Sequence, residues 1–323
     1  MIYAPIIIPT LSRYEHLKKC IESLADNEYA KYTDLFISVD FPPEEKYVEG
    51  YEKIKNYLSK GIDGFKNVCI HYQNYNLGPM GNSDFLLGLI SEKYDRYIYT
   101  EDDNIFAPNY LEYMDKGLEL FENNKDIFAI YATGPSVEGE RPKNANVYLL
   151  KFFSAYGYGT WLDRTQEISR VVNRDYIENI ACDKKTLKRM YDENSVTICA
   201  LASAVLRKEK VYTLPDGRVP IIDMILMIYA IVENKYIVCS KEHMVKNNGY
   251  DGSGVNCGKE DAPFKGVVLS QERHFDYVIK DEINCCRLKV NRKISHRMRV
   301  LLAYIKIVLW RFLANRKLLA KSE

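Results

Sequence analysis

The 323-residue chain is long enough for one large domain or two small ones, and its 47% hydrophobic and 28% charged residues are the balance of a globular protein with a packed core. The eight cysteines include no C-x-x-C pair, which argues against a zinc site, and with no recognisable secretory signal they are typical of a reduced, cytosolic protein. The net charge of +1 hides an acidic body, with 34 Lys/Arg and 43 Asp/Glu over residues 1–286, and a basic tail, with 11 Lys/Arg and one acid over residues 287–323.

Strand and helix patterns alternate through the first 131 residues. A capping box, in which Ser12 precedes Glu15 by three residues, predicts the start of the first helix. The alternation as a whole predicts an α/β fold with a mostly parallel sheet and helices on both faces. The predicted strands are 4–9, 34–41, 67–73, 97–103 and 127–131, and the predicted helices are 12–24, 44–60, one from Pro79 and 108–123.

The pattern becomes less regular after Thr133. The predicted features there are a glycine- and aromatic-rich segment at 154–161, a polar helix at 184–194, a helix at 221–233 opened by Pro220, a strand at 237–239 and a glycine-rich loop at 243–258. We therefore divide the chain into one half of a main domain at 1–135, a second half at 136–286 and a basic amphipathic tail at 287–323.

Three consecutive carboxylates, Glu101, Asp102 and Asp103, follow the predicted strand that begins at Tyr97. Adjacent acids repel one another, and hard cations such as Mg²⁺ or Mn²⁺, which prefer oxygen ligands, would neutralise them. If the strand continued through the acids, Glu101 and Asp103 would project to one side and Asp102 to the other. A solvated acidic turn is the alternative, but ligand sites in open α/β sheets lie at the carboxyl ends of strands.

Three segments resemble nucleotide-sugar glycosyltransferases of the GT-A type, close to glycosyltransferase family 2: IIIPTLSR at 6–13, YIYTEDDNIFAPNYLEY at 97–113 and NNGYDGSGVNCG at 247–258. The second segment is also similar to the metal-binding strand of the Golgi N-acetylglucosaminyltransferase that initiates complex N-glycans. The resemblance implies a Rossmann-like GT-A fold. It also implies a metal-dependent, inverting transfer of a hexose or N-acetylhexosamine from a nucleotide-sugar, expected to be a UDP-sugar, to a glycan or polyprenyl-diphosphate-linked acceptor in polysaccharide synthesis.

The same resemblance implies roles for individual residues. It assigns Asp103 to Mn²⁺ or Mg²⁺, which would stabilise the charge on a departing diphosphate. It assigns six residues to the binding of the donor: Thr10, Arg13, Asp40, Asn76, Glu101 and Asp102. For several of them, a solvated side chain or a turn-forming role is the alternative.

An inverting transferase needs a base for the acceptor hydroxyl, and the resemblance points to Asp223. An acid at a helix start also stabilises the helix dipole, which is the structural alternative. Tyr158 and Trp161 are expected to form a stacking surface for the acceptor, although a core tryptophan is equally compatible with the pattern. Asp251 and Ser253, in the glycine-rich loop, are expected to order over the donor when it binds, and Asp251 is also expected to contribute to the acceptor site. Asn256 replaces a histidine common in relatives, so a second protein ligand for the metal is not expected there.

Two other classes of protein compete with this interpretation. A nucleotidyltransferase shares the sheet type and metal chemistry, but residues 9–13 lack the glycine of its phosphate loop. A carbohydrate- or membrane-binding module would not need the acidic triplet together with Asp223. Nucleic acid is not an expected partner, because the body is acidic and the tail strongly apolar.

The basic tail is too short and too charged to span a bilayer and fits a helix lying in the membrane plane. We expect a peripheral protein on the cytoplasmic face of an anionic cell membrane, where the tail would hold enzyme and lipid-linked acceptor in one plane. Packing of the tail on the protein's own body or in a homodimer is the alternative.

Overall fold

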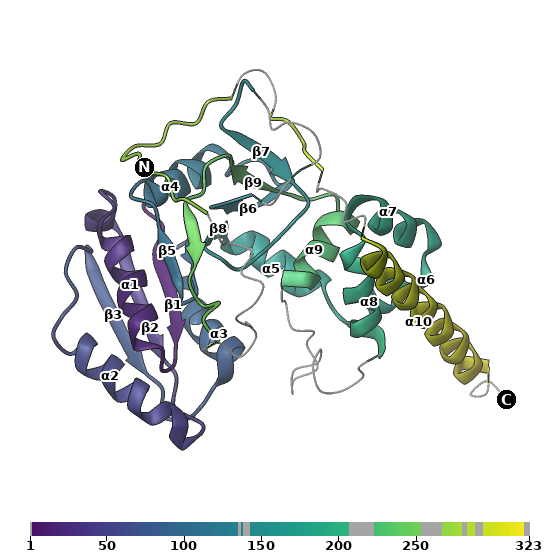
Figure 1. Ribbon diagram of the computed structural model, residues 1–323, viewed down its shortest axis with the longest axis horizontal. Helices are drawn as coiled ribbons and strands as arrows, with labels where there is room; N and C mark the ends of the chain where they lie inside the picture. The colour runs from purple at the N-terminus through teal and green to yellow at the C-terminus, as the bar shows by residue number, and fades with distance from the viewer. Residues whose placement is uncertain are drawn as a thin grey trace.

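The computed structural model describes residues 2–134, 137, 143–206, 223–252, 267–279, 283–287 and 293–319, with residues 314–319 described by their backbone only. Within these residues, an eight-stranded sheet has the order β3-β2-β1-β4-β8-β6-β9-β7 (Figure 1). Its strands are β1 (Ile6–Thr10), β2 (Asp34–Val39), β3 (Asn67–Tyr72), β4 (Arg96–Tyr99), β6 (Ile127–Tyr131), β7 (Val147–Leu150), β8 (Tyr158–Trp161) and β9 (Tyr236–Ser240).

The first half of the sheet is parallel, because β2 and β4 both run parallel to the central strand β1, and β3 runs parallel to β2. In the second half, β8 runs antiparallel to both β4 and β6, while β9 is parallel to β6 and antiparallel to β7. A separate antiparallel ribbon joins β5 (Asn104–Phe106) to β10 (Val245–Asn247). The predicted α/β class is therefore confirmed, with a mixed and mostly parallel sheet.

Helices cover both faces of the sheet because successive residues of β1 point to opposite sides. Ile6 and Ile8 pack with residues of α1 (Tyr14–Ala25), α2 (Val48–Leu58) and α4 (Tyr110–Leu120). Ile7, between them, packs with α3 (Gly78–Ser91) on the other face. This alternation fixes the register in which the carboxyl ends of the central strands meet.

A second core joins the far half of the sheet to a helical layer and includes residues of β6, β7 and β9. Its helices are α5 (Leu162–Val171), α6 (Arg174–Cys182), α7 (Lys184–Asn194), α8 (Val196–Leu206), α9 (Asp223–Val232) and α10 (Ile294–Leu319). Helix α10 packs on α8 and projects from the body toward the C-terminus (Figure 1). No helix in the described ranges is long and apolar enough to cross a membrane.

Several predicted boundaries are corrected by the structure. The capping box is wrong: α1 begins at Tyr14, its N-cap is Arg13, and no side chain caps it, because Ser12 lies one residue too early. The predicted helix at 44–60 starts as a 3₁₀ turn, η2 (Glu45–Tyr47), before α2, and another 3₁₀ turn, η1 (Ala30–Tyr32), precedes β2. Pro220 and the first residues of the helix predicted at 221–233 lie outside the described residues, as do Ser253 and Asn256.

Candidate active site

The acidic triplet lies where two parallel strands end side by side. Strand β1 ends at Thr10, and its neighbour β4 ends at Tyr99, so the chain turns before the acids. The Thr10 hydroxyl donates a hydrogen bond of 2.7 Å to Oδ2 of Asp102. The expectation that the strand continues through the triplet is therefore wrong.

Arg13 is the cation that neutralises the two aspartates. Its Nη1 donates to Oδ2 of Asp103 at 2.7 Å, and its Nη2 forms a second ion pair with Oδ1 of Asp102. The two carboxylates therefore converge on one guanidinium instead of projecting to opposite sides. Burial lowers the pKa of Arg13, but the two carboxylates raise it by more, so this arginine stays charged. The alternative of a solvated Arg13 is not what the structure contains, since its side chain is only 24% exposed.

Asp103 is also enclosed by the end of β10 and the residues that follow it. Asn247, the last residue of β10, donates from Nδ2 to Oδ1 of Asp103 at 2.7 Å, and the Asn248 amide donates to the Asp103 carbonyl oxygen at 2.8 Å. A Cβ on Gly249 would lie 2.1 Å from Oδ2 of Asp103, so this approach requires glycine. We call Thr10, Arg13, Asp102, Asp103 and Asn247 the acid clamp. Nothing in the sequence singles out Asn247 as a partner of Asp103, although it lies in the NNG segment that carries the resemblance.

The surroundings of the acidic triplet decide whether it can hold a metal ion. In the described part of the chain, no three His, Cys, Asp or Glu side chains are placed around a common point as a metal site. Both oxygens of Asp103 already accept hydrogen bonds, from Arg13 and from Asn247. The chemistry of the donors nevertheless suits a hard divalent cation, because Asp102 and Asp103 bring carboxylate oxygens together at one guanidinium. Release of Arg13 would leave their oxygens available.

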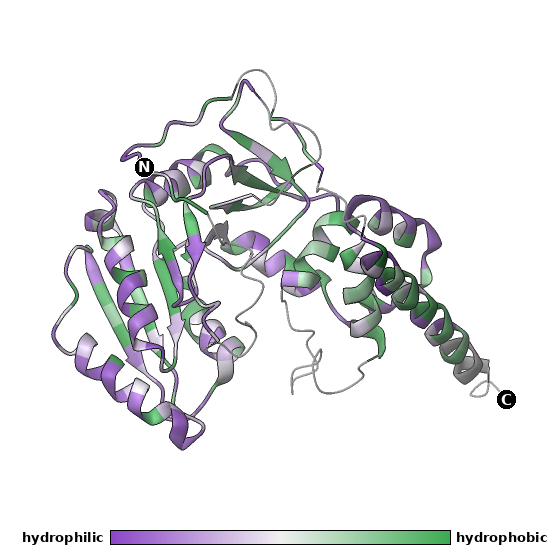
Figure 2. Cartoon of the chain, viewed as in Figure 1, coloured by the Kyte–Doolittle hydropathy of each residue, from purple (hydrophilic) through white to green (hydrophobic). Residues whose placement is uncertain are grey.

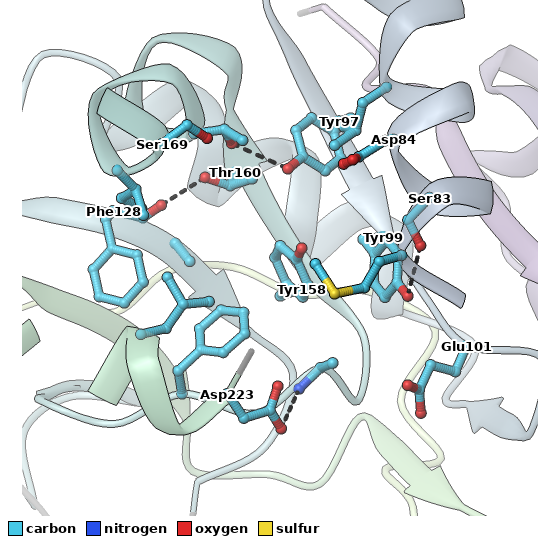
Figure 3. Close-up of a pocket in the computed structure, with 18 of the residues that line it drawn as sticks. Ser83, Asp84, Tyr97, Tyr99, Glu101, Phe128, Tyr158, Thr160, Ser169 and Asp223 are labelled. Carbon is cyan, nitrogen blue, oxygen red and sulfur yellow. Dashed lines mark hydrogen bonds between the residues drawn. The ribbon is translucent and has the colours of Figure 1, made fainter. Parts of the chain in front are cut away.

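A cavity of about 550 Å³ adjoins the clamp, between α3 on one side and α5 and α9 on the other (Figure 3). Glu101 and Asp223 lie at one end of it, and Asp84, Tyr97 and Ser169 lie at the other. Its walls are largely aromatic and apolar, as is usual for ligand sites. The remaining lining residues are Pro79, Met80, Ser83, Leu87, Tyr99, Phe128, Ala129, Phe153, Ala155, Tyr156, Tyr158, Thr160, Thr165, Ile168, Val172, Met224 and Leu226.

The two carboxyl groups at the end of the cavity nearest the clamp, Glu101 and Asp223, bind protons more tightly than ordinary acids. Burial, followed by the charges of Asp103, Asp223 and Asp102, raises the pKa of Glu101 to about 8. Asp223 is the first residue of α9, and Oδ2 of its side chain accepts the Ala155 amide at 3.2 Å. Burial raises its pKa as well, although this hydrogen bond opposes the shift. Acids with raised pKa values that face one cavity are typical of catalytic sites.

Asp40 and Asn76 meet at the ends of β2 and of the loop before α3. Oδ1 of Asp40 accepts the Leu77 amide at 2.8 Å, and its Oδ2 accepts Nδ2 of Asn76 at 3.0 Å. Asn76 also donates to the carbonyl oxygen of Phe41 at 2.7 Å. The two residues therefore brace two loops together, as the turn-forming alternative predicted. Asn82, by contrast with the exposed Asn76, is buried, and it donates to the Ser38 carbonyl oxygen at 3.0 Å.

The structure separates two of the predicted acceptor residues, Tyr158 and Trp161, because they point to opposite faces of β8. Tyr158 lines the cavity and stacks on Tyr99, with ring centroids 5.3 Å apart. Trp161 is only 2% exposed and donates from Nε1 to the Leu118 carbonyl oxygen at 3.2 Å, so it is a core residue. The reason is the period of a strand: residues 158 and 160 of β8 face the cavity, whereas residue 161 faces α4.

Asp251 lies away from the cavity lining. It is exposed, and its Oδ2 lies 3.0 Å from Nε2 of His16 on α1. The neighbouring Tyr250 does reach the cavity wall, because its hydroxyl lies 2.9 Å from that of Tyr156. The contact between Asp251 and α1 holds the segment that follows β10 over the acid clamp.

Comparisons with known proteins give weak similarities only. No protein-family model matches the chain, and no curated protein does. Among solved structures, it resembles S. aureus TarS 1–349 in complex with UDP, with 14% identity and a TM-score of 0.30 over 44% of this chain and 39% of that one. It also resembles a mannosyltransferase from Pyrobaculum calidifontis in complex with GDP-Man and Mn²⁺, with 10% identity and a TM-score of 0.39 over 71% and 69% of the two chains. Mouse xyloside xylosyltransferase 1 gives 10% identity and a TM-score of 0.36 over 72% and 83%.

Proposed function

We propose that this chain is a glycosyltransferase that moves a sugar from a nucleotide-sugar to a hydroxyl group of its acceptor, with inversion at the transferred carbon. The observation that carries the proposal is the pair of carboxyl groups, Glu101 and Asp223, at the end of the cavity that adjoins the acid clamp. The resemblance of the three sequence segments to GT-A glycosyltransferases supports the same assignment.

Asp223 is assigned the role of general base. Its carboxylate would accept the proton of the acceptor hydroxyl while that oxygen forms a bond to the anomeric carbon of the sugar. The bond from the anomeric carbon to the phosphate oxygen breaks, and the nucleoside diphosphate leaves with the electron pair. Burial of Asp223 supports the role, because a raised pKa makes its carboxylate a better proton acceptor than an exposed aspartate.

Glu101 and Tyr158 are assigned to the sugar. With a pKa of about 8, Glu101 is mostly protonated at neutral pH and can donate a hydrogen bond to a sugar hydroxyl. The stacked rings of Tyr99 and Tyr158 offer an aromatic wall to the sugar. The nucleoside is assigned to the ends of β1 and β2, near Thr10, Asp40 and Asn76.

Arg13 is assigned to the diphosphate. In the free protein its guanidinium is held by Asp102 and Asp103. A diphosphate offers the same bidentate oxygen geometry, so the arginine can exchange the aspartates for the donor. The released carboxylates of Asp102 and Asp103 would then hold Mn²⁺ or Mg²⁺. Such an ion supplies Lewis-acid stabilisation of the departing diphosphate when bound.

A donor screen tests this function. The full chain is incubated with UDP-hexoses, UDP-N-acetylhexosamines and GDP-mannose, with Mn²⁺ or EDTA, and released nucleoside diphosphate is measured. We expect release from one donor class in the presence of the metal, increased by a suitable acceptor. Binding of nucleoside triphosphates with release of pyrophosphate would instead indicate a nucleotidyltransferase, and failure to bind either a nucleotide-sugar or a nucleoside triphosphate would refute both enzyme assignments.

A further inference from the structure

Helix α10 uses one of its faces to pack on the protein. Val300, Ala303 and Ile307 lie on this face, are 0–7% exposed and belong to the core that includes α8 and α9. Nε2 of the neighbouring His296 lies 3.0 Å from the Ser195 hydroxyl. This face of the helix therefore packs on the protein's own body, which was the alternative expectation for the tail.

The opposite face of α10 is apolar and exposed to solvent, and we call it the outer face. Apolar residues run along the helix in Figure 2, and it projects away from the body in Figure 1. Single exposed apolar side chains are ordinary, but a contiguous row of this length marks an interaction surface. Its members, each 43–79% exposed, are Ile294, Met298, Leu301, Leu302, Ile305, Val308, Leu309, Phe312 and Leu313.

Cations border the outer face on both sides. Arg299 and Lys306 are seven residues apart, about two helical turns, and lie along one border. Arg297 and Arg311 are fourteen residues apart, about four turns, and lie along the other. The helix contains no Asp or Glu anywhere between Ile294 and Leu319.

The neighbouring helix α7 continues the positive charge. Lys184, Lys188 and Tyr191 of α7 line a groove together with Arg297 and Leu301 of α10. The Lys188 ammonium pairs with Asp192 at 2.5 Å, but Lys184 adds a further positive charge at this border. The groove thus extends the border of the outer face onto the body of the protein.

We propose that the outer face of α10 docks in the plane of an anionic lipid bilayer. The apolar row would enter the boundary between headgroups and acyl chains, and the flanking arginines and lysines would meet lipid phosphates. A second copy of the chain is a poorer occupant, because a symmetric dimer through this face would bring two acid-free, positively charged surfaces together. The surface goes beyond the proposed transferase site and does not depend on it.

The test is flotation of the full chain with phosphatidylcholine vesicles that either contain or lack phosphatidylglycerol. We expect the protein to float with the anionic vesicles, to remain behind with the neutral ones, and to be released by high salt. Ile305→Glu/Leu309→Glu should lower the partition coefficient at least about tenfold. Arg299→Gln/Lys306→Gln should lower it roughly thirtyfold, which corresponds to two lost cation–lipid contacts.

The control for an apolar-to-glutamate change is Leu120→Glu, which places one glutamate at another exposed leucine, 53% exposed, on α4. This variant should float like the wild type. Thermal unfolding establishes that every variant is folded, and nucleotide release with a soluble acceptor separates this proposal from the transferase assignment. The proposal is overturned if the wild type ignores anionic vesicles, if the α10 variants float unchanged, or if sedimentation shows a dimer that Ile305→Glu/Leu309→Glu dissolves while vesicles are not bound.

Discussion

Replacing Arg13 by glutamine removes the guanidinium that joins Asp102 to Asp103. Both carboxylates are only 3–4% exposed, so the loss leaves negative charge that water cannot fully solvate. Removing one partner of a buried ion pair typically costs 3–5 kcal/mol. Since Arg13 is itself 24% exposed, we expect a loss near the lower limit, about 3 kcal/mol in the free energy of unfolding.

The loss should depend on pH and on divalent cations. Burial already raises the pKa of Asp102, and removal of Arg13 removes an opposing charge. Protonation at low pH would therefore relieve the uncompensated charge, so the destabilisation should be larger at pH 8 than at pH 5. Mn²⁺ should stabilise the variant more than the wild type, because the carboxylate oxygens no longer bind a guanidinium.

Urea unfolding in EDTA and in Mn²⁺ measures both effects. Arg273→Gln is the matched control, because Arg273 pairs with Asp26 at 3.0 Å and both side chains are more than 50% exposed. Exposed pairs contribute less than about 1 kcal/mol, so this control should change little. The double variant Arg13→Gln/Asp103→Asn should be more stable than the sum of the two single changes predicts. If Arg13→Gln is no more harmful than Arg273→Gln, or if Mn²⁺ stabilises variant and wild type equally, the acid clamp does not act as described.

Two further predictions concern Glu101 and Gly249. In the folded state Glu101 keeps its proton up to a pKa of about 8, whereas in the unfolded state it loses that proton at the ordinary pKa of a carboxyl group. The free energy of unfolding of the wild type should therefore fall as the pH rises between these two pKa values. In Glu101→Gln this fall should shrink by on the order of 4 kcal/mol between pH 5 and 8.5 in chemical denaturation, and identical pH profiles would contradict it. Gly249→Ala should cost about 1–3 kcal/mol in the same measurement, because its Cβ would collide with Asp103. Gly88→Ala in α3 is its control, since nothing lies within 4 Å of that Cβ and a helix favours alanine, and equal effects of the two changes would refute the close approach at 249.

The first half of the fold could be predicted from local patterns. Continuous apolar strands and the helices between them leave a parallel sheet as the arrangement that buries both faces. The insertion of β8 between β4 and β6 could not be predicted in this way. It pairs residues about 60 positions apart in sequence, and a short segment with two glycines gives little strand signal.

The candidate site shows the same division. The position of the acidic triplet after a central strand was predicted, because strand ends and ligand sites coincide in open sheets. The binding of Asp102 and Asp103 by Arg13, and the approach of Asn247, depend on contacts about 90 and 144 residues apart along the chain, respectively. The sequence left two environments open for Trp161, the acceptor site and the core, because composition alone does not show which face of β8 a residue occupies.

Asp223→Asn, measured for donor binding and for transfer in the same preparation, tests the central claim most directly. The substitution keeps the shape and the hydrogen bond from the Ala155 amide but cannot accept a proton. We predict that calorimetry finds nucleotide-sugar binding as in the wild type, while transfer to the acceptor falls by about 10²–10⁴-fold. Transfer near the wild-type rate would contradict the assignment of Asp223 as the base, and loss of donor binding in step with transfer would show that the residue serves the structure of the site instead.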